Sequence, residues 1–383
     1  MSSPDFPPAV QSGIRLRSID ALRGAAALAV VVHHAVNAGI APPATATWYP
    51  ALSDLADYGR MGVPLFFVLS GFCIHFRWAQ RRARGEDARI AFLPFWRRRL
   101  WRLYPPYLVA LVFSMAIVLA AYFTHPNVPL LAGYPTPKLP WIGGDFLAHV
   151  LMLHGLIPAF DRAGGNAPFW TLAREEYFYL MYFGLLAFRE RFGPFKAMAG
   201  VVVLGLLFPL AFRPFLAPDS AWWGVINSSS ITLWAQWCLG LLGVEAFHGL
   251  IILPGFTRDL RLVPLWVGLG VWTNHFAPVA LAPLAWGMAF FTLVNAVVTR
   301  ERARGWNPGR LTGWLAQVGV YSYSIYLIHH PVRGLVKRVL ERWIVSGNLL
   351  SFIAANAVVV IAGYYAGRLF FILVERRFIN HKA

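Results

Sequence analysis

Residues 23–34 read Arg-Gly-Ala-Ala-Ala-Leu-Ala-Val-Val-Val-His-His, an apolar, helix-forming run with a guanidinium at one end and two histidines at the other. On an α-helix the steps from Arg23 to His34 cover about 16 Å, roughly half the thickness of a bilayer core. They also make about three turns, so both side chains lie on nearly the same face. Ionisable groups inside a membrane helix are costly and indicate function, so we expect the rest of the chain to supply partners for them.

The composition of the chain is that of a protein embedded in lipid. Of its 383 residues, 58% are hydrophobic and 13% are charged. The formal charge of +17 could indicate a nucleic acid partner, yet the basic residues form short blocks between apolar runs. The positive-inside rule explains that distribution better. We therefore predict a multi-pass membrane protein with cytoplasmic termini and no nucleic acid partner.

The apolar runs predict an all-α, polytopic transmembrane bundle of about ten spans. The expected spans lie near residues 19–40, 60–78, 102–122, 170–188, 197–215, 230–248, 263–277, 279–299, 311–330 and 348–374. A further apolar stretch, 146–158, is short for crossing, and we expect a re-entrant or interfacial helix there. One transmembrane domain over 19–374 would then lie between cytoplasmic tails at 1–18 and 375–383.

This topology leaves one anomaly in the distribution of basic residues. Lysine and arginine should gather in the inner segments, but four of them follow the ninth span on the outer side. They are Arg333, Lys337, Arg338 and Arg342. Either a functional patch lies there or one span has been miscounted.

Several chemistries lack their motifs in this sequence. There is no Gly-x-x-x-x-Gly-Lys-Ser/Thr phosphate loop, no His-Glu-x-x-His zinc pattern and no Gly-x-Ser-x-Gly elbow. Cys73 and Cys238 lie inside apolar runs, which indicates a packing role. They support neither a disulfide nor a thiolate metal site. The adjacent histidines at 33–34 and 329–330 point about 100° apart on a helix, so neither pair converges on one ion. We expect no metal.

A dense basic cluster precedes the third span, where residues 97–106 read Arg-Arg-Arg-Leu-Trp-Arg-Leu-Tyr-Pro-Pro. Its arginines are Arg97, Arg98, Arg99 and Arg102. A guanidinium suits phosphate because its planar fork donates two parallel hydrogen bonds. The alternative is orientation by positive charge together with binding to anionic lipid heads, and the cluster alone favours that alternative.

Carboxylates and a serine also occur inside or beside predicted spans. Glu175 and Glu176 begin the fourth span, where the helix dipole alone favours acidic residues. A catalytic role needs one of them to point inward, toward His34 or the substrate, and spacing cannot choose between them. Ser70 lies among small residues of the second span and would line a substrate cavity; close helix packing is the alternative.

Hydroxyl groups follow much of the ninth span, which contains Tyr-Ser-Tyr-Ser-Ile-Tyr-Leu-Ile-His-His-Pro over 321–331. So many polar groups in one span indicate a face that lines a cavity, with Tyr323, Tyr326 and His329 as candidate lining residues. The alternative is interhelical hydrogen bonding together with an aromatic belt.

Together these blocks resemble the membrane-bound acyltransferase 3 family, which O-acylates cell-surface carbohydrates and some small molecules. The resemblance rests on five blocks in the family's order: Ile19-Asp-Ala-Leu-Arg-Gly with His34, Gly62-Val-Pro-Leu-Phe-Phe-Val-Leu-Ser-Gly-Phe, Arg97-Arg-Arg-Leu-Trp-Arg-Leu-Tyr-Pro, Trp170-Thr-Leu-Ala-Arg-Glu-Glu-Tyr-Phe-Tyr and Ser322-Tyr-Ser-Ile-Tyr-Leu-Ile-His. Each block is weak alone, and the combination is specific. Two positions depart from the usual pattern: Thr171 stands where serine is common, and Arg174 where an apolar residue is usual.

The resemblance implies a ten-helix domain in a bacterial inner membrane. Such a domain takes an acyl group, usually acetyl from cytoplasmic acetyl-CoA, to a hydroxyl at the outer face. By position, Arg23 and His34 match the family's essential pair, and Arg97 with Arg99 matches its Arg-x-Arg motif near the donor entrance. The acceptor would be a glycan or a lipid-linked sugar. We expect no fused extracytoplasmic domain, so transfer would be direct or through a separate acceptor protein.

Acyl transfer from a thioester needs a base for the acceptor hydroxyl, and histidine suits that role near neutral pH. We expect His34 to be this base. The phosphates of coenzyme A would remain at the arginine cluster while its pantetheine arm passes Arg23. A hydroxyl of Tyr323 or Tyr326 would stabilise the oxyanion.

Two other functions fit parts of the pattern. A transporter or flippase would use the buried arginine and histidine as a proton or substrate relay, although it favours inverted repeats, which the sequence does not show. A sensor or scaffold would bind membrane lipids or a partner through its basic loops. Thiol release from acetyl-CoA separates the enzyme from both.

Overall fold

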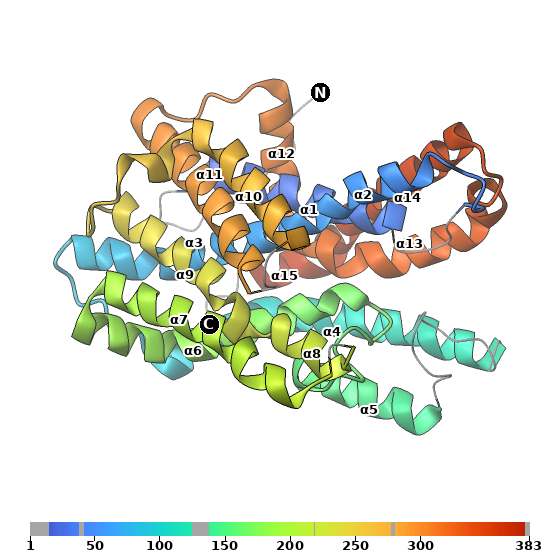
Figure 1. Cartoon of the computed structure of the whole chain (residues 1–383), viewed down its shortest axis with the longest axis horizontal. Helices are drawn as coiled ribbons and strands as arrows, with labels where there is room; N and C mark the ends of the chain where they lie inside the picture. The colour runs from blue at the N-terminus through green and yellow to red at the C-terminus, as the bar shows by residue number, and fades with distance from the viewer. Residues whose placement is uncertain (1–14, 38–41, 125–137, 218, 277–279, 380–383) are drawn as a thin grey trace.

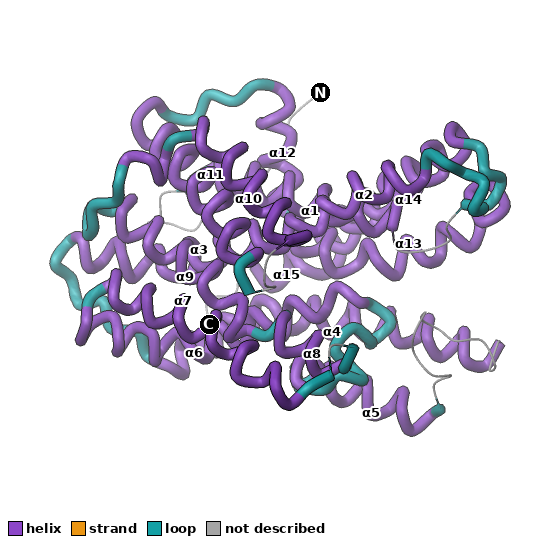
Figure 2. Tube along the Cα trace, viewed as in Figure 1, coloured by secondary structure: helices purple, strands orange, loops and turns teal. Residues whose placement is uncertain are grey.

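The computed structural model describes residues 15–37, 42–124, 138–217, 219–276 and 280–379, and all regular secondary structure in these ranges is helical (Figures 1 and 2). The longer helices are α1 (Arg17–Asn37), α3 (Gly62–Ala83), α4 (Phe92–Thr124), α6 (Trp170–Phe192), α7 (Pro194–Phe212), α9 (Ser230–Phe247), α10 (Val263–Phe276), α11 (Ala282–Arg304), α12 (Arg310–Val320), α13 (Ser322–Ile344) and α14 (Leu349–Phe370). The shorter ones are α2 (Tyr49–Asp57), α5 (Leu139–Val150), α8 (Ala221–Asn227) and α15 (Arg376–Ile379).

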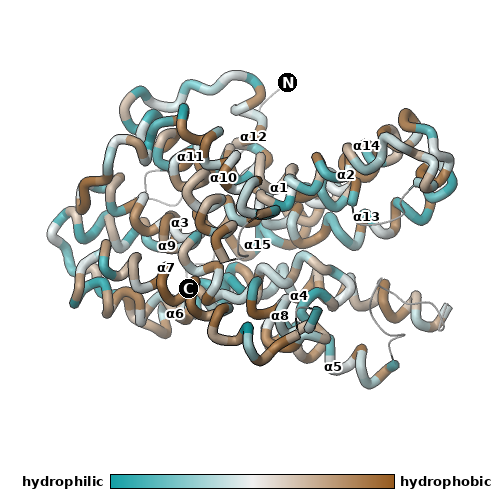
Figure 3. The backbone as a smooth tube through the Cα atoms, viewed as in Figure 1, coloured by the Kyte–Doolittle hydropathy of each residue, from teal (hydrophilic) through white to brown (hydrophobic). Residues whose placement is uncertain are grey.

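Seven helical segments within the described ranges are long and apolar enough to cross a membrane. They contain α1, α3, α4, α7, α9, α11 and α14. Apolar residues follow these helices through the whole molecule, while hydrophilic residues interrupt α13 (Figure 3). The predicted all-α, polytopic bundle is thus confirmed. The number of ten spans stays a prediction, because α10 is short and α6 and α13 carry many polar residues.

The arginine cluster, which was expected to precede the third span, lies on the same helix as that span. α4 begins at Phe92 and has 33 residues. At 1.5 Å per residue it is about 50 Å long, which exceeds a bilayer core of about 30 Å. Its first turns can therefore extend beyond the apolar layer and carry the arginines there.

The expected span 311–330 was also wrong, because the chain forms two helices that meet at Tyr321. The Ser322 hydroxyl donates to the Gly319 carbonyl at 2.9 Å. The Tyr321 hydroxyl donates to the hydroxyl of Tyr364 on α14, also at 2.9 Å. These tertiary and capping contacts stabilise the turn. As a result α12 packs against α1, while α13 packs against α14 (Figure 1).

Pro331 lies inside α13 and does not end it. A proline lacks the N–H that would bond the carbonyl of residue 327, four positions earlier. The side-chain amide of Asn166 donates to that carbonyl, of Leu327, at 2.8 Å, and Asn166 is fully buried. The loop before α6 therefore completes the hydrogen bonding of α13 beside His329 and His330.

The apolar stretch 146–158 does not form one helix. α5 ends at Val150, and the chain turns through Leu151 and Met152, where Met152 has a φ of 56°. α5 has 12 residues, too few to span a bilayer core. The segment between α5 and α6 is then built of short turns.

Glycine residues allow two helix pairs to approach closely. At Gly71 a side chain would meet the backbone of Trp237 on α9, and at Gly24 it would meet the backbone of Leu315 on α12. Small residues at such crossings let backbones pack directly, as in many membrane helix pairs. The close packing expected for the second span is thus confirmed at Gly71. The crossing at Gly24 fixes the position of α1 at the residue that follows Arg23.

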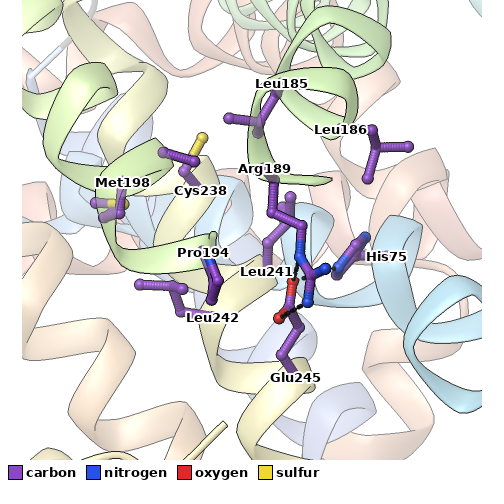
Figure 4. Close-up of a pocket in the computed structure, with 11 residues that line it drawn as sticks. His75, Leu185, Leu186, Arg189, Pro194, Met198, Cys238, Leu241, Leu242 and Glu245 are labelled. Atoms are coloured by element: carbon purple, nitrogen blue, oxygen red, sulfur yellow. Dashed lines mark hydrogen bonds and ion pairs between the residues drawn. The ribbon is translucent and has the colours of Figure 1, made fainter. Parts of the chain in front are cut away.

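A buried ionic network joins α3, α6 and α9 (Figure 4). His75 contacts the Tyr182 hydroxyl at 2.7 Å and the Glu245 carboxylate at 3.0 Å. Arg189 donates two hydrogen bonds to Glu245, at 2.9 and 2.6 Å, and its guanidinium lies 4.5 Å from the ring centre of Trp78. Every member has a partner, so the network holds the three helices in register.

We expect Glu245→Ala to destabilise the bundle by about 3 kcal/mol, because it leaves buried His75 and half-buried Arg189 without their shared acceptor. Thermal unfolding of the purified protein in detergent measures the loss. Glu190, exposed on α6, is the matched control, and Glu190→Ala should unfold at the wild-type temperature. Equal unfolding temperatures for the two variants would contradict a structural role of the network.

Candidate active site

His34 on α1 faces two histidines of α13. Its Nδ1 lies 3.4 Å from Nε2 of His329, and the ring centres are 5.2 Å from His329 and 5.4 Å from His330. His329 and His330 are buried, whereas His34 is half-buried. We call these three residues the histidine cluster. Within the described residues no group of His, Cys, Asp and Glu side chains is arranged to hold a metal ion.

The hydrogen bonds of the histidine cluster determine which nitrogens can accept a proton. Nδ1 of His34 lies 2.9 Å from the carbonyl oxygen of Val30, and Nδ1 of His329 lies 3.0 Å from that of Ile325. A carbonyl only accepts, so both Nδ1 atoms carry the hydrogen in these bonds. Nε2 of His34 then holds the lone pair that a general base needs.

The His33 ring lies beside that of His34, with ring centres 4.7 Å apart, but its polar contacts are with Asn37 and with Asp57 at the end of α2. Its Nδ1 lies 3.5 Å from the Asp57 carboxylate and 3.5 Å from the side-chain amide of Asn37. His33 and His34 are neighbours on one helix, yet they have different surroundings. His33 is therefore a suitable control for substitutions of His34.

Glu175 lies at the centre of a second polar group. The Ser70 hydroxyl donates to its Oε1, and the Tyr179 hydroxyl donates to the same oxygen at 2.5 Å. The indole N–H of Trp237 in turn donates to the Ser70 hydroxyl at 3.2 Å. We call Ser70, Glu175, Tyr179 and Trp237 the carboxylate cluster. Glu176 makes none of these contacts, so the structure distinguishes two carboxylates that spacing could not.

Arginines surround the carboxylate cluster. The Arg99 guanidinium lies 5.9 Å from the ring centre of Tyr179. The charges of Arg23 and Arg102 interact with each other, and both interact with the Tyr179 hydroxyl. Arg23 also interacts electrostatically with Glu175. Positive charge therefore meets the carboxylate cluster from α1 and from α4.

The four arginines of α4 differ in what they contact. Arg99 and Arg102 are three residues apart, which places them on one side of the helix, toward Tyr179. Arg97, Arg98 and Arg102 are all exposed, but no described contact brings Arg97 or Arg98 to the carboxylate cluster. Of the predicted donor residues, the structure thus brings together Arg99 and Arg102.

Glu375 lies beside the candidate site, and it was not predicted from the sequence. It lies in the helical turn after α14 and is buried, and it accepts a hydrogen bond from the Ser324 hydroxyl. Its charge interacts with those of Arg102 and Arg23. The only signal in the sequence was a carboxylate at the end of a long apolar run, which positive-inside reasoning assigned to the tail.

Tyr326 connects the two clusters. Its hydroxyl donates to the Pro168 carbonyl at 2.8 Å and lies 2.5 Å from the Thr171 hydroxyl. Its ring centre is 5.8 Å from that of His329. Thr171 is one helical turn before Glu175, so both share a face of α6. Polar residues therefore continue from the carboxylate cluster to the histidine cluster.

The two candidate tyrosines already donate their hydroxyl hydrogens to backbone carbonyls. Tyr323 donates to the carbonyl of Leu103 on α4 at 2.8 Å, and Tyr326 donates to that of Pro168. A hydroxyl has one hydrogen to give. Stabilisation of an oxyanion by either residue would need one of these bonds to break.

Arg174 is a structural residue beside the site. Its guanidinium donates to the Asp161 carboxylate at 2.6 Å and to the carbonyl of Ser228 at 2.7 Å. It is buried, and it points to the loop before α6 and to the start of α9. The unusual arginine therefore does not pair with Glu175, which remains bonded to Ser70 and Tyr179.

Comparison with known proteins identifies the family. A family model described as "Acyltransferase domain" matches residues 16–368. The chain belongs to this acyltransferase family. Among curated relatives, "Acyltransferase MdmB" of Streptomyces mycarofaciens is 25% identical over 380 residues, which cover 94% of this chain and 90% of the relative. No solved structure matches the chain.

A second relative, "Peptidoglycan O-acetyltransferase OatA" of Listeria monocytogenes, is 28% identical over 352 residues. The match covers 85% of this acyltransferase but 50% of the relative, so the chain spans half the relative's length. The histidine and carboxylate clusters both lie inside the matched family region. Glu375 lies beyond it, and the fold nevertheless brings Glu375 to the same arginines.

We expect Glu175→Gln to lower acyltransferase activity at least about tenfold, because it weakens two hydrogen bonds to a charged acceptor. Glu176→Gln, one residue away, should have a smaller effect. Thiol release from acetyl-CoA by the purified protein measures both, and thermal unfolding shows whether each variant folds. Greater loss in the Glu176 variant would overturn the assignment.

Proposed function

We propose that this acyltransferase moves an acyl group, most simply acetyl, from acyl-CoA on the cytoplasmic side of a bacterial inner membrane to a hydroxyl of a glycan or lipid-linked sugar at the outer face. The observation that carries the proposal is the row of polar residues through the bundle. It runs from Arg99 past Glu175, Thr171 and Tyr326 to His34. Such a row supports a reaction that joins substrates arriving from opposite sides of the membrane.

In this proposal His34 is the general base. Its Nε2 takes the proton of the acceptor hydroxyl while the oxygen attacks the thioester carbonyl. The carbon–sulfur bond then breaks, and the leaving thiolate of coenzyme A takes the proton from His34, which returns to its neutral form. The bond between Nδ1 and the Val30 carbonyl supports this role, because it fixes the tautomer and the ring orientation.

The donor phosphates would bind at the start of α4. Arg99 and Arg102 face the carboxylate cluster, and the exposed Arg97 and Arg98 would contact phosphate nearer to the solvent. Arg23 lies about three helical turns before His34 on α1. Its charge interacts with those of Glu175 and Glu375, but it makes no ion pair within 4.0 Å with a described residue, so a donor group that passes it would meet its guanidinium.

Glu175 would act by positioning rather than by proton transfer. It already accepts hydrogen bonds from Ser70 and Tyr179, and its charge interacts with Arg23. A carboxylate held in this way orients the arginine and limits the positive charge that the donor meets. Glu375 would hold Arg102 and Arg23 from the other side in the same manner.

Replacement of His34 tests the base. We expect His34→Ala to lower acceptor-dependent thiol release from acetyl-CoA about 100-fold or more, the usual contribution of a positioned base. His33→Ala should retain most of the activity, because His33 faces Asp57. Full transfer by the His34 variant would remove this histidine from the mechanism, and substrate movement without thiol release would indicate a transporter.

Replacement of Arg99 tests the donor site. Arg99→Gln removes a charge-assisted contact to phosphate, so we expect the KM for acetyl-CoA to rise about tenfold while kcat changes little. Arg89, exposed in the loop before α4, is the matched control, and Arg89→Gln should leave the KM unchanged. An unchanged KM in the Arg99 variant would place the donor elsewhere.

A further inference from the structure

A row of basic side chains continues from the histidine cluster along α13. His330, Arg333 and Lys337 are three and four residues apart, so they share one face of the helix. Arg333 lies 3.1 Å from Nε2 of His330 through one guanidinium nitrogen. A guanidinium only donates, so His330 accepts this bond and is neutral in this contact.

The two cations of this row have no anionic partner among the described residues. Lys337 is 3% exposed, and its ammonium nitrogen has no hydrogen-bond partner there. Nε of Arg333 is likewise buried and unpartnered. The charge that interacts with Lys337 is that of Arg333, which repels it. Burial therefore has a desolvation free-energy cost for both residues, and no ion pair with a described residue compensates for it.

Buried, unpaired charge is strongly unfavourable unless a ligand completes it. By contrast, buried Arg174 and half-buried Arg189 both bind carboxylates. Nearby on α13, Arg338 is exposed to solvent. Of the basic residues after the ninth expected span, Arg333 and Lys337 thus point inward, and Arg338 faces solvent.

The row adjoins the proposed base. The ring centre of His330 is 5.4 Å from that of His34, and the charge of Arg333 interacts with both His34 and His329. A group bound by Arg333 and Lys337 would therefore lie close enough to His34 for one acceptor molecule to contact both. An anion there would also offset the positive charge that faces the imidazolium formed when His34 takes a proton.

We propose that His330, Arg333 and Lys337 form a binding site for an anionic group, a phosphate or a carboxylate, on the acceptor. The proposal rests on the proposed function, because it takes the hydroxyl that receives the acyl group to lie at His34. It narrows the acceptor to a sugar that carries such a group near the reacting hydroxyl. Neutral sugars would bind more weakly, because they leave the two cations unpaired.

Direct binding tests the site without requiring turnover. The full-length protein in nanodiscs of phosphatidylcholine, with saturating coenzyme A to occupy other phosphate sites, is titrated calorimetrically with glucose 1-phosphate, glucuronate and glucose. We expect at least one anionic probe to bind, and glucose to bind at least tenfold more weakly. Lys337→Met should weaken binding of that probe at least tenfold, whereas Arg338→Gln should leave it unchanged.

Thermal unfolding separates loss of the site from loss of the fold. The anionic probe should raise the unfolding temperature of the wild-type protein and not that of the Lys337 variant. Without the probe, Lys337→Met should unfold at or above the wild-type temperature, because it removes an unpaired buried charge. If that variant does not fold, Arg333→Gln is titrated in its place with the same expected loss.

Two outcomes would overturn the proposal. The first is equal binding of the anionic probes by the wild-type protein and the variant, including no binding by either. The second is loss of wild-type binding when phosphatidylglycerol replaces phosphatidylcholine, because the site then holds a lipid headgroup and not an acceptor. Failure of the proposed function would appear separately, as absent thiol release from acetyl-CoA in the wild-type protein with every sugar.

Discussion

The contact of α1 with its neighbours is the constraint on which this structure depends. Small residues bring α1 against α12 at Gly24, and the same helix faces α13 at His34. The carbonyl of Val30 sets the orientation of the His34 ring. Because α12 and α13 are joined at Tyr321, the packing of one end of α1 and the histidine cluster at its other end are parts of one arrangement.

Buried charge occurs in this bundle in three states. Glu245 is fully bonded and serves architecture, since His75 and Arg189 fill its acceptor sites. Glu175 accepts hydrogen bonds on one oxygen, and its charge interacts with that of Arg23. Lys337 has no described partner. The degree to which a charge is satisfied therefore separates structural groups from groups that can meet a ligand.

The sequence was sufficient for the fold class and for the residues that carry the family resemblance, because apolar runs and short motifs are local signals. It failed where tertiary hydrogen bonds decide the outcome. The turn at Tyr321 depends on a hydroxyl of α14, and the uninterrupted course of α13 through Pro331 depends on Asn166. The choice of Glu175 depends on Ser70, a residue on another helix.

The hydrogen bond between Asn166 and the Leu327 carbonyl couples the segment before α6 to α13. If that segment swings outward, α13 loses a hydrogen bond at its proline, where a helix bends most easily. The bend would fall directly beside His329 and His330. The position of this segment and the alignment of the histidine cluster would then change together.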